Sequence, residues 1–154
     1  MTTTVFGGTG FIGCHLVALL LQIGATVRVA VRHPGHVKIP AGSAEAPQIV
    51  QADILDVTGV GSAITGADSV VNLVGILTET TTQSYRAIHV EGARRVALAA
   101  QRQGVTRLIH LSALGASLSS PAISDRTNAE GENARSSCIP GGNDRPAEPH
   151  LRRG

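Results

Sequence analysis

The sequence predicts an α/β protein built on a doubly wound parallel sheet of about five strands, followed by an irregular C-terminal tail. Strand-like and helix-like segments alternate through the first two thirds of the chain, and a glycine-rich turn joins the first strand to the first helix. The composition agrees with this fold class, because 42% hydrophobic and 16% charged residues suit a buried parallel sheet better than a disordered chain.

The elements follow from apolar patterning and from the residues that end each segment. Short β-branched or apolar runs predict strands over residues 2–6, 25–31, 48–52, 69–74 and 107–111. Apolar residues at helical spacing predict helices over residues 11–23, 60–64 and 84–102, with Asp56 or Thr58 capping the second. We expect residues 1–118 to form the domain, because residues 119–154 show helical periodicity only over 128–135.

The turn after the first strand reads Gly7-Gly8-Thr9-Gly10-Phe11-Ile12-Gly13. Glycines at its first, fourth and seventh positions allow a sharp bend, a close approach of backbone to a pyrophosphate, and tight packing of helix on strand. Backbone amides at the helix N-terminus then supply the positive potential that phosphates need. This context predicts a Rossmann-type site for a pyridine dinucleotide, and the alternative is a tight turn with no ligand.

Residues at the ends of the other strands extend the predicted site. The second strand ends at Arg32, where NAD-specific sites carry an acid, so we expect NADP(H) rather than NAD(H), unless Arg32 is a solvated surface cation. Asp53 and Ile54 follow the third strand and are expected to meet the adenine. The predicted cofactor-binding residues are thus Gly7, Gly8, Thr9, Gly10, Phe11, Ile12, Gly13, Arg32, Asp53, Ile54, Leu73, Val74 and Gly75.

Several runs together resemble the atypical and extended short-chain dehydrogenase/reductase superfamily. They are V-F-G-G-T-G-F-I-G, A-D-I-L-D, V-V-N-L-V-G and L-I-H-L-S-A-L-G. Three runs are similar to the branch that contains the nucleotide-binding accessory subunit of respiratory complex I and its bacterial relatives. They are N-L-V-G-I-L, H-V-E-G-A-R-R-V-A and H-L-S-A-L-G-A. The resemblance covers residues 4 to 133.

The resemblance also places the family's catalytic set on this chain. Ser112 matches the family's serine, whereas S-D-R-T-N-A-E-G-E resembles Y-x-R-[ST]-K-A-x-G-E and puts Ser124 and Asn128 where tyrosine and lysine are expected. A serine hydroxyl is a far poorer acid than a phenol, and an amide carries no charge. Ser112 is therefore interpreted as vestigial, and Tyr85, the only tyrosine, lies on another predicted helix.

The resemblance implies an NAD(P)-binding member of this branch that is non-catalytic, because its acid and base are missing, and in which the cofactor serves a structural or assembly role. A respiratory or other protein assembly is the expected partner. Two alternatives stay open: an NADP-dependent reductase or epimerase-like enzyme, or a fragment of one, and a regulator that senses the redox state of NADP(H). Missing tyrosine and lysine weigh against the enzyme.

Charge and composition exclude other classes. A formal net charge of +2 gives no reason to expect a nucleic acid partner. No apolar run approaches the roughly twenty residues of a membrane span, so membrane contact would be peripheral and made through a partner. We expect a bacterial cytoplasmic protein, or one at the inner face of the membrane. Cys14 and Cys138 lack metal-ligand or disulfide spacing, and no metal site is predicted.

The tail suggests a change of reading frame. The family's sixth strand, of the type T-I-V-R-P-S-L-I-F-G, is missing after the remnant of the tyrosine and lysine helix. Asn143 to Arg152 can be encoded as AAC GAT CGT CCG GCC GAG CCT CAT CTT CGG, which read one base later gives T-I-V-R-P-S-L-I-F. We hypothesise a frameshift near residues 133–140, the alternative being a genuine, disordered polar tail, and the coding DNA distinguishes the two.

Overall fold

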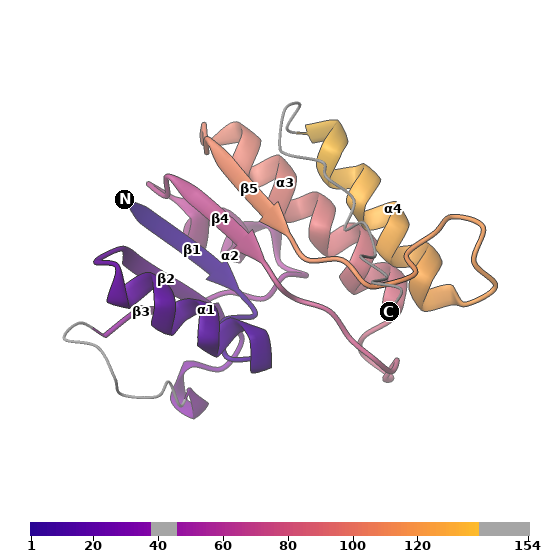
Figure 1. Cartoon of the computed structure of the whole chain (residues 1–154), viewed down its shortest axis with the longest axis horizontal. Helices are drawn as coiled ribbons and strands as arrows, with labels where there is room; N and C mark the ends of the chain where they lie inside the picture. The colour runs from indigo at the N-terminus through magenta and orange to yellow at the C-terminus, as the bar shows by residue number, and fades with distance from the viewer. Residues whose placement is uncertain (38–45, 139–154) are drawn as a thin grey trace, which may run out of the picture.

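The protein folds around one five-stranded sheet in which all strands run parallel (Figure 1). The computed structural model describes residues 1–37 and 46–138. The strand order is β3-β2-β1-β4-β5, with β1 in the centre. The strands are β1 Thr2–Phe6, β2 Thr26–Val31, β3 Gln48–Gln51, β4 Ser69–Asn72 and β5 Arg107–His110. The predicted fold class, a doubly wound Rossmann-type sheet, is confirmed.

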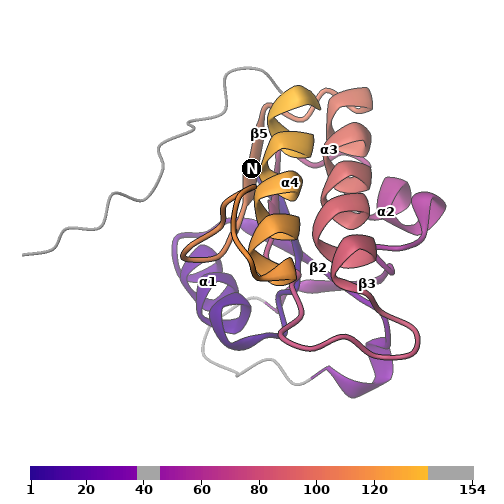
Figure 2. The ribbon, with the colours of Figure 1, turned by 90° about the vertical axis from the view of Figure 1, so that its right-hand side faces the viewer.

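Helices cover both faces of the sheet. On one face lies α1, and on the other lie α2, α3 and α4, with α4 running beside α3 (Figure 2). The helical segments are α1 Phe11–Gln22, the short 3-10 helix η1 Pro34–His36, α2 Val57–Ile64, the π-helix η2 Arg86–Gly92, α3 Ala93–Arg102 and α4 Ile123–Cys138. Within the described ranges, no helix has both the length and the apolar character that crossing a membrane requires.

Successive side chains of a strand point to opposite faces of the sheet, and this alternation divides the core into two layers. Val5 of β1 packs with Val29 of β2 and Val71 of β4 beneath α1. The next residue, Phe6, points to the opposite layer and packs with apolar side chains of α2, η2 and α3. This period of two is what a parallel sheet buried on both faces requires, and it explains why neighbouring strand residues such as Val70 and Val71 are both apolar and buried.

The second helix begins where an aspartate caps it. The Asp56 carboxylate accepts hydrogen bonds from the backbone N–H groups of Thr58 and Gly59, each at 3.0 Å. These amides have no partner within the helix, so the side chain satisfies them. Of the two residues predicted as the cap, Asp56 is thus the one that fills the role.

Three elements differ from the sequence prediction. The fourth strand ends at Asn72 rather than at residue 74, and the long helix expected over residues 84–102 divides into η2 and α3. Apolar spacing could not reveal this division, because a single π segment shifts the periodicity by less than one turn. The last helix, α4, spans Ile123–Cys138, twice the stretch that showed helical periodicity.

The sequence gives little sign of α4 because the face that it buries is made of small residues. Thr127, Ala129 and Gly131 are buried, and a Cβ added to Gly131 would collide with the carbonyl oxygen of His89 in η2. Small side chains let two helices approach closely, but they contribute little to a hydrophobic pattern. Residues 139–154, which carry the last part of the predicted tail and the shifted-frame strand, lie outside the described residues.

This contact predicts that Gly131→Ala destabilises the protein. The added methyl group has no room between α4 and η2, so we expect the free energy of unfolding to fall by about 1–3 kcal/mol. Urea denaturation measures this change, and Glu132→Ala, at an exposed neighbouring position, is the matched control. Equal stability of the two variants would contradict the packing of α4 on η2.

Candidate dinucleotide site

The glycine turn lies at the carboxyl end of β1, between the central strand and α1. Gly7 has φ +77°, the left-handed region, and its carbonyl accepts a hydrogen bond from the Gly10 N–H at 3.0 Å. A Cβ on Gly13 would collide with the Gly7 carbonyl and lie 2.6 Å from the Gly8 Cα. The first glycine therefore makes the bend and the last lets α1 pack on the turn, as the spacing predicted.

The N-terminus of α1 has free donors. Gly10 is its N-cap residue, no side chain caps this end, and no acidic residue occupies the first turn. The first backbone N–H groups of a helix have no intrahelical partner, and the helix dipole adds positive potential there. This end of α1 is thus built to accept an anion.

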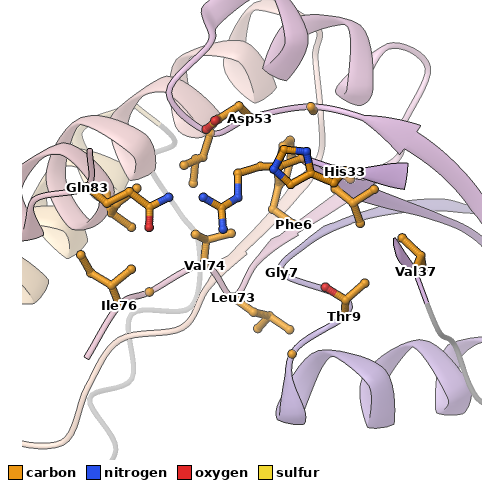
Figure 3. Close-up of a pocket in the computed structure, with 18 residues that line it drawn as sticks. Phe6, Gly7, Thr9, His33, Val37, Asp53, Leu73, Val74, Ile76 and Gln83 are labelled. Atoms are coloured by element: carbon orange, nitrogen blue, oxygen red, sulfur yellow. The ribbon is translucent and has the colours of Figure 1, made fainter. Parts of the chain in front are cut away.

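A pocket of about 430 Å³ opens beside the turn, at the carboxyl ends of the strands. Figure 3 shows Thr9 and Val37 at one side of it and Ile76 and Gln83 at the other. Ligands of open α/β sheets bind in this place, where the chain order reverses between β1 and β4.

The ends of β2 and β3 supply the charged groups of the pocket. Arg32 and His33 follow β2, and Asp53 follows β3 (Figure 3). The Asp53 carboxylate accepts a hydrogen bond from the Leu55 N–H at 2.9 Å, which fixes the turn after β3. Arg28, by contrast, points away from this site, because its guanidinium donates to the carbonyl of Ala63 at the end of α2 at 2.8 Å.

The segment after β4 forms the opposite wall of the pocket. Leu73 N–H donates to the Phe6 carbonyl at 3.0 Å, and Val74 N–H donates to the Asn72 Oδ1 at 3.1 Å. Further along, the Ile76 N–H donates to the His89 Nε2 at 3.1 Å. Regular strand pairing has ended by then, so each hydrogen bond holds one residue of the wall in place.

Most of the predicted cofactor-binding residues come together here. Nine of them line the pocket: Gly7, Thr9, Gly10, Arg32, Asp53, Ile54, Leu73, Val74 and Gly75. Gly8, Phe11, Ile12 and Gly13 do not line it. Gly8 and Gly13 are buried in the packing between the turn, β2 and α1, whereas Phe11 and Ile12 are exposed.

Sequence reasoning missed as many lining residues as it found. They are Phe6, Ala30, Val31, His33, Val37, Ala52, Ile76, Gln83 and Ile88. Phe6, Ala30, Val31 and Ala52 end the strands or follow them, so the strand predictions themselves carried the signal. Val37, Gln83 and Ile88 are brought in by the connecting segments and by η2, and no motif marks them.

The residues at the family's catalytic positions lie outside the pocket. The Asn128 side-chain amide donates to the Ser124 carbonyl at 2.9 Å, within α4 itself. The Ser112 hydroxyl is buried and has no hydrogen-bond partner among the described residues. The Tyr85 hydroxyl donates to the Leu77 carbonyl at 2.8 Å, so it holds the loop after β4.

A buried histidine, His89, and a half-buried one, His110, lie behind the pocket wall. Asn72 Nδ2 donates to His110 Nδ1 at 3.2 Å, because the Asn72 Oδ1 is taken by Val74. Burial is the largest cause that lowers the pKa of His110 to about 4, followed by the positive charge of Arg135 and by the nearby His89 ring. Burial also lowers the pKa of His89. Both imidazoles are therefore neutral at neutral pH, and the described residues contain no cluster of three metal-ligating side chains.

The family model described as NAD(P)H-binding matches residues 7–136. That range holds the glycine turn, the pocket and nearly all of α4. The chain belongs to this NAD(P)H-binding family. The predicted resemblance to the short-chain dehydrogenase/reductase superfamily, and to its branch related to a complex I subunit, is confirmed by this match and by the relatives.

The NAD(P)H-binding chain is similar to subunits of respiratory enzymes. It is 32% identical over 142 residues to "NADH-ubiquinone oxidoreductase 40 kDa subunit, mitochondrial" of Neurospora crassa, covering 90% of this chain and 38% of that protein. It is 33% identical to "NADH dehydrogenase [ubiquinone] 1 alpha subcomplex subunit 9, mitochondrial" of Arabidopsis thaliana, covering 91% and 36%. The chain thus spans well under half the length of these curated relatives.

An enzyme is also among the relatives, and solved structures share the fold. "Cinnamoyl-CoA reductase 1" of Petunia hybrida is 35% identical over 117 residues, covering 73% of this chain and 35% of that protein. A short-chain dehydrogenase/reductase superfamily protein from Agrobacterium tumefaciens, solved with bound NAD, superposes with a TM-score of 0.75 at 24% identity, covering 92% of this chain and 46% of that one. At this identity the structural likeness shows the fold alone.

The neutral histidines predict a loss of stability in mild acid. Because the folded state lowers the pKa of His110 from 6.5 to about 4, the unfolded chain binds more protons between these values. The contribution of the neutral His110 to the free energy of unfolding is complete above about pH 6.5. It is lost as the pH drops toward 4, and the loss is at most about 3 kcal/mol.

Urea denaturation across this pH range measures the effect. His110→Asn keeps an acceptor for Asn72 but cannot be protonated, so its stability should depend less on pH. His15→Gln, at an exposed position of α1, controls for the loss of one imidazole. The same pH dependence in His110→Asn as in the unchanged protein would contradict the assignment.

Proposed function

We propose that this protein is a non-catalytic NADP(H)-binding subunit, in which the bound dinucleotide stabilises the fold and supports docking onto a larger redox assembly. The observation that carries the proposal is the pocket beside the glycine turn, because the uncapped N-terminus of α1 and the carboxyl ends of the strands meet there. The assembly role is supported by the names of the respiratory relatives. Those names place the relatives in mitochondria, and the bacterial cytoplasmic location of this chain stays a prediction.

The residues of the turn fit a pyrophosphate. Gly10 lines the pocket, and a Cβ built on it would meet only the Gly7 carbonyl, at 3.3 Å, so open space lies in front of its backbone. Two phosphates can approach the first backbone N–H groups of α1 without a side chain between them. The dinucleotide, when bound, supplies a nicotinamide that can carry a hydride.

The absence of catalysis is proposed from the side chains at the family's acid and base positions. Ser124 and Asn128 replace tyrosine and lysine, and the Asn128 amide is bonded to its own helix. Neither side chain is available as a charged partner for a reacting oxygen. The relative named cinnamoyl-CoA reductase supports the second candidate, an NADP-dependent reductase for which Ser112 would hold the substrate oxygen.

Titration with cofactor distinguishes these functions. We expect NADPH to raise the melting temperature, because a ligand at 100 times its Kd stabilises the folded state by about 2.7 kcal/mol. We also expect no oxidation of NADPH when the purified protein is mixed with quinones, aldehydes or CoA thioesters. NADPH oxidation that Ser112→Ala abolishes would favour the reductase instead.

The preference for NADP(H) is proposed to depend on Arg32. No acidic residue follows β2, and the exposed guanidinium of Arg32 lines the pocket next to His33. Arginine is suited to a 2′-phosphate, because its planar group donates two parallel hydrogen bonds.

Arg32→Ala should therefore weaken NADPH binding about tenfold and leave NADH binding nearly unchanged. Arg107→Ala is the matched control, since Arg107 is exposed at the start of β5 and does not line the pocket. Calorimetric titration with both nucleotides provides the measurement. Equal weakening of NADPH and NADH by Arg32→Ala would contradict the preference.

A further inference from the structure

We propose that His89, which does not line the pocket, is a positioning residue of the dinucleotide site: it fixes Ile76 and thereby the pocket wall formed after β4. This inference rests on the proposed NAD(P)H-binding function and assigns a role to a histidine that is not among the predicted cofactor-binding residues.

Both ring nitrogens of His89 are engaged, and the side chain is only 3% exposed. The Nε2 accepts the Ile76 N–H at 3.1 Å, so the ring proton lies on Nδ1. Nδ1 then donates to the Thr127 Oγ1 of α4, also at 3.1 Å, and the single proton of this hydroxyl is shared between the carbonyls of Ile123 and Ser124. The bond to Ile76 thus sets the tautomer, and the bond to Thr127 ties the ring to α4.

The pocket wall depends on this bond because strand pairing no longer supports it. The fourth strand ends at Asn72, and the wall continues through Gly75 to Ile76. The next residue of the wall segment, Leu77, is held by a hydrogen bond from the Tyr85 hydroxyl to its carbonyl. The Tyr85 ring lies against the His89 ring, with the two centroids 5.4 Å apart. His89 and Tyr85 therefore hold the part of the segment that contains Ile76 and Leu77.

The backbone of His89 is fixed as well. It lies in the π-helix η2, a form that is rare and often found at functional sites. On its other side, Gly131 of α4 approaches the His89 carbonyl so closely that a methyl group would collide with it. The ring can therefore move little, and it holds the backbone of Ile76, which lines the pocket (Figure 3).

Two amide substitutions separate the bonds of the ring. In His89→Gln the side-chain amide reaches the place of Nε2 and can still accept the Ile76 N–H, whereas in His89→Asn it reaches only the place of Nδ1 and can bond Thr127. Thr127→Val is the matched control, because it breaks the bond to α4 and leaves the bond to Ile76. For each variant, NADPH affinity is measured by calorimetry and apo-protein stability by urea denaturation.

We expect His89→Gln to bind NADPH within about threefold of the unchanged protein and His89→Asn to bind about tenfold more weakly. Thr127→Val should lose stability and keep its affinity. The inference is overturned if His89→Asn binds as well as His89→Gln, or if affinity simply follows stability across the three variants. Should the unchanged protein bind neither NADPH nor NADH, the proposed function fails and this inference with it.

Discussion

The close contact between Gly7 and the segment after β4 is the constraint on which the site depends. A Cβ at Gly7 would lie 3.0 Å from the Leu73 carbonyl carbon and 3.2 Å from the Val74 nitrogen. With a left-handed backbone and no side chain, Gly7 lets the turn of β1 meet the end of β4. The pocket opens where these two segments diverge, and α1 begins on the same turn.

The residues that line the pocket and the residues at the family's catalytic positions occupy different parts of the fold. The glycine turn and the ends of β1, β2 and β4 surround the pocket, whereas the family's catalytic positions lie after β5 and on α4. On that side, Asn128 bonds within its own helix and Ser112 has no partner among the residues described. Binding of the dinucleotide therefore does not require an acid and a base, and this separation is the basis of the proposed non-catalytic role.

The sequence predicted those parts of the structure that depend on local chemistry. Strand patterning located all five strands, and the glycine spacing located the turn, because backbone geometry there tolerates few residues. It could not predict Gln83 in the pocket or the bonds of His89, since these depend on how distant segments meet. It also underestimated α4, whose buried face is formed by residues as small as Gly131.

The most direct test of the account is the NADPH affinity of Gly10→Leu. Gly10 has φ −75°, which any residue adopts, and a Cβ there would meet the Gly7 carbonyl at 3.3 Å and nothing else within 4 Å, so the variant should fold with a modest loss of stability. The leucine side chain would stand where the phosphates are proposed to lie, and we predict that calorimetry detects no NADPH binding. Unchanged NADPH affinity in the folded variant would contradict the claim that this turn holds the dinucleotide.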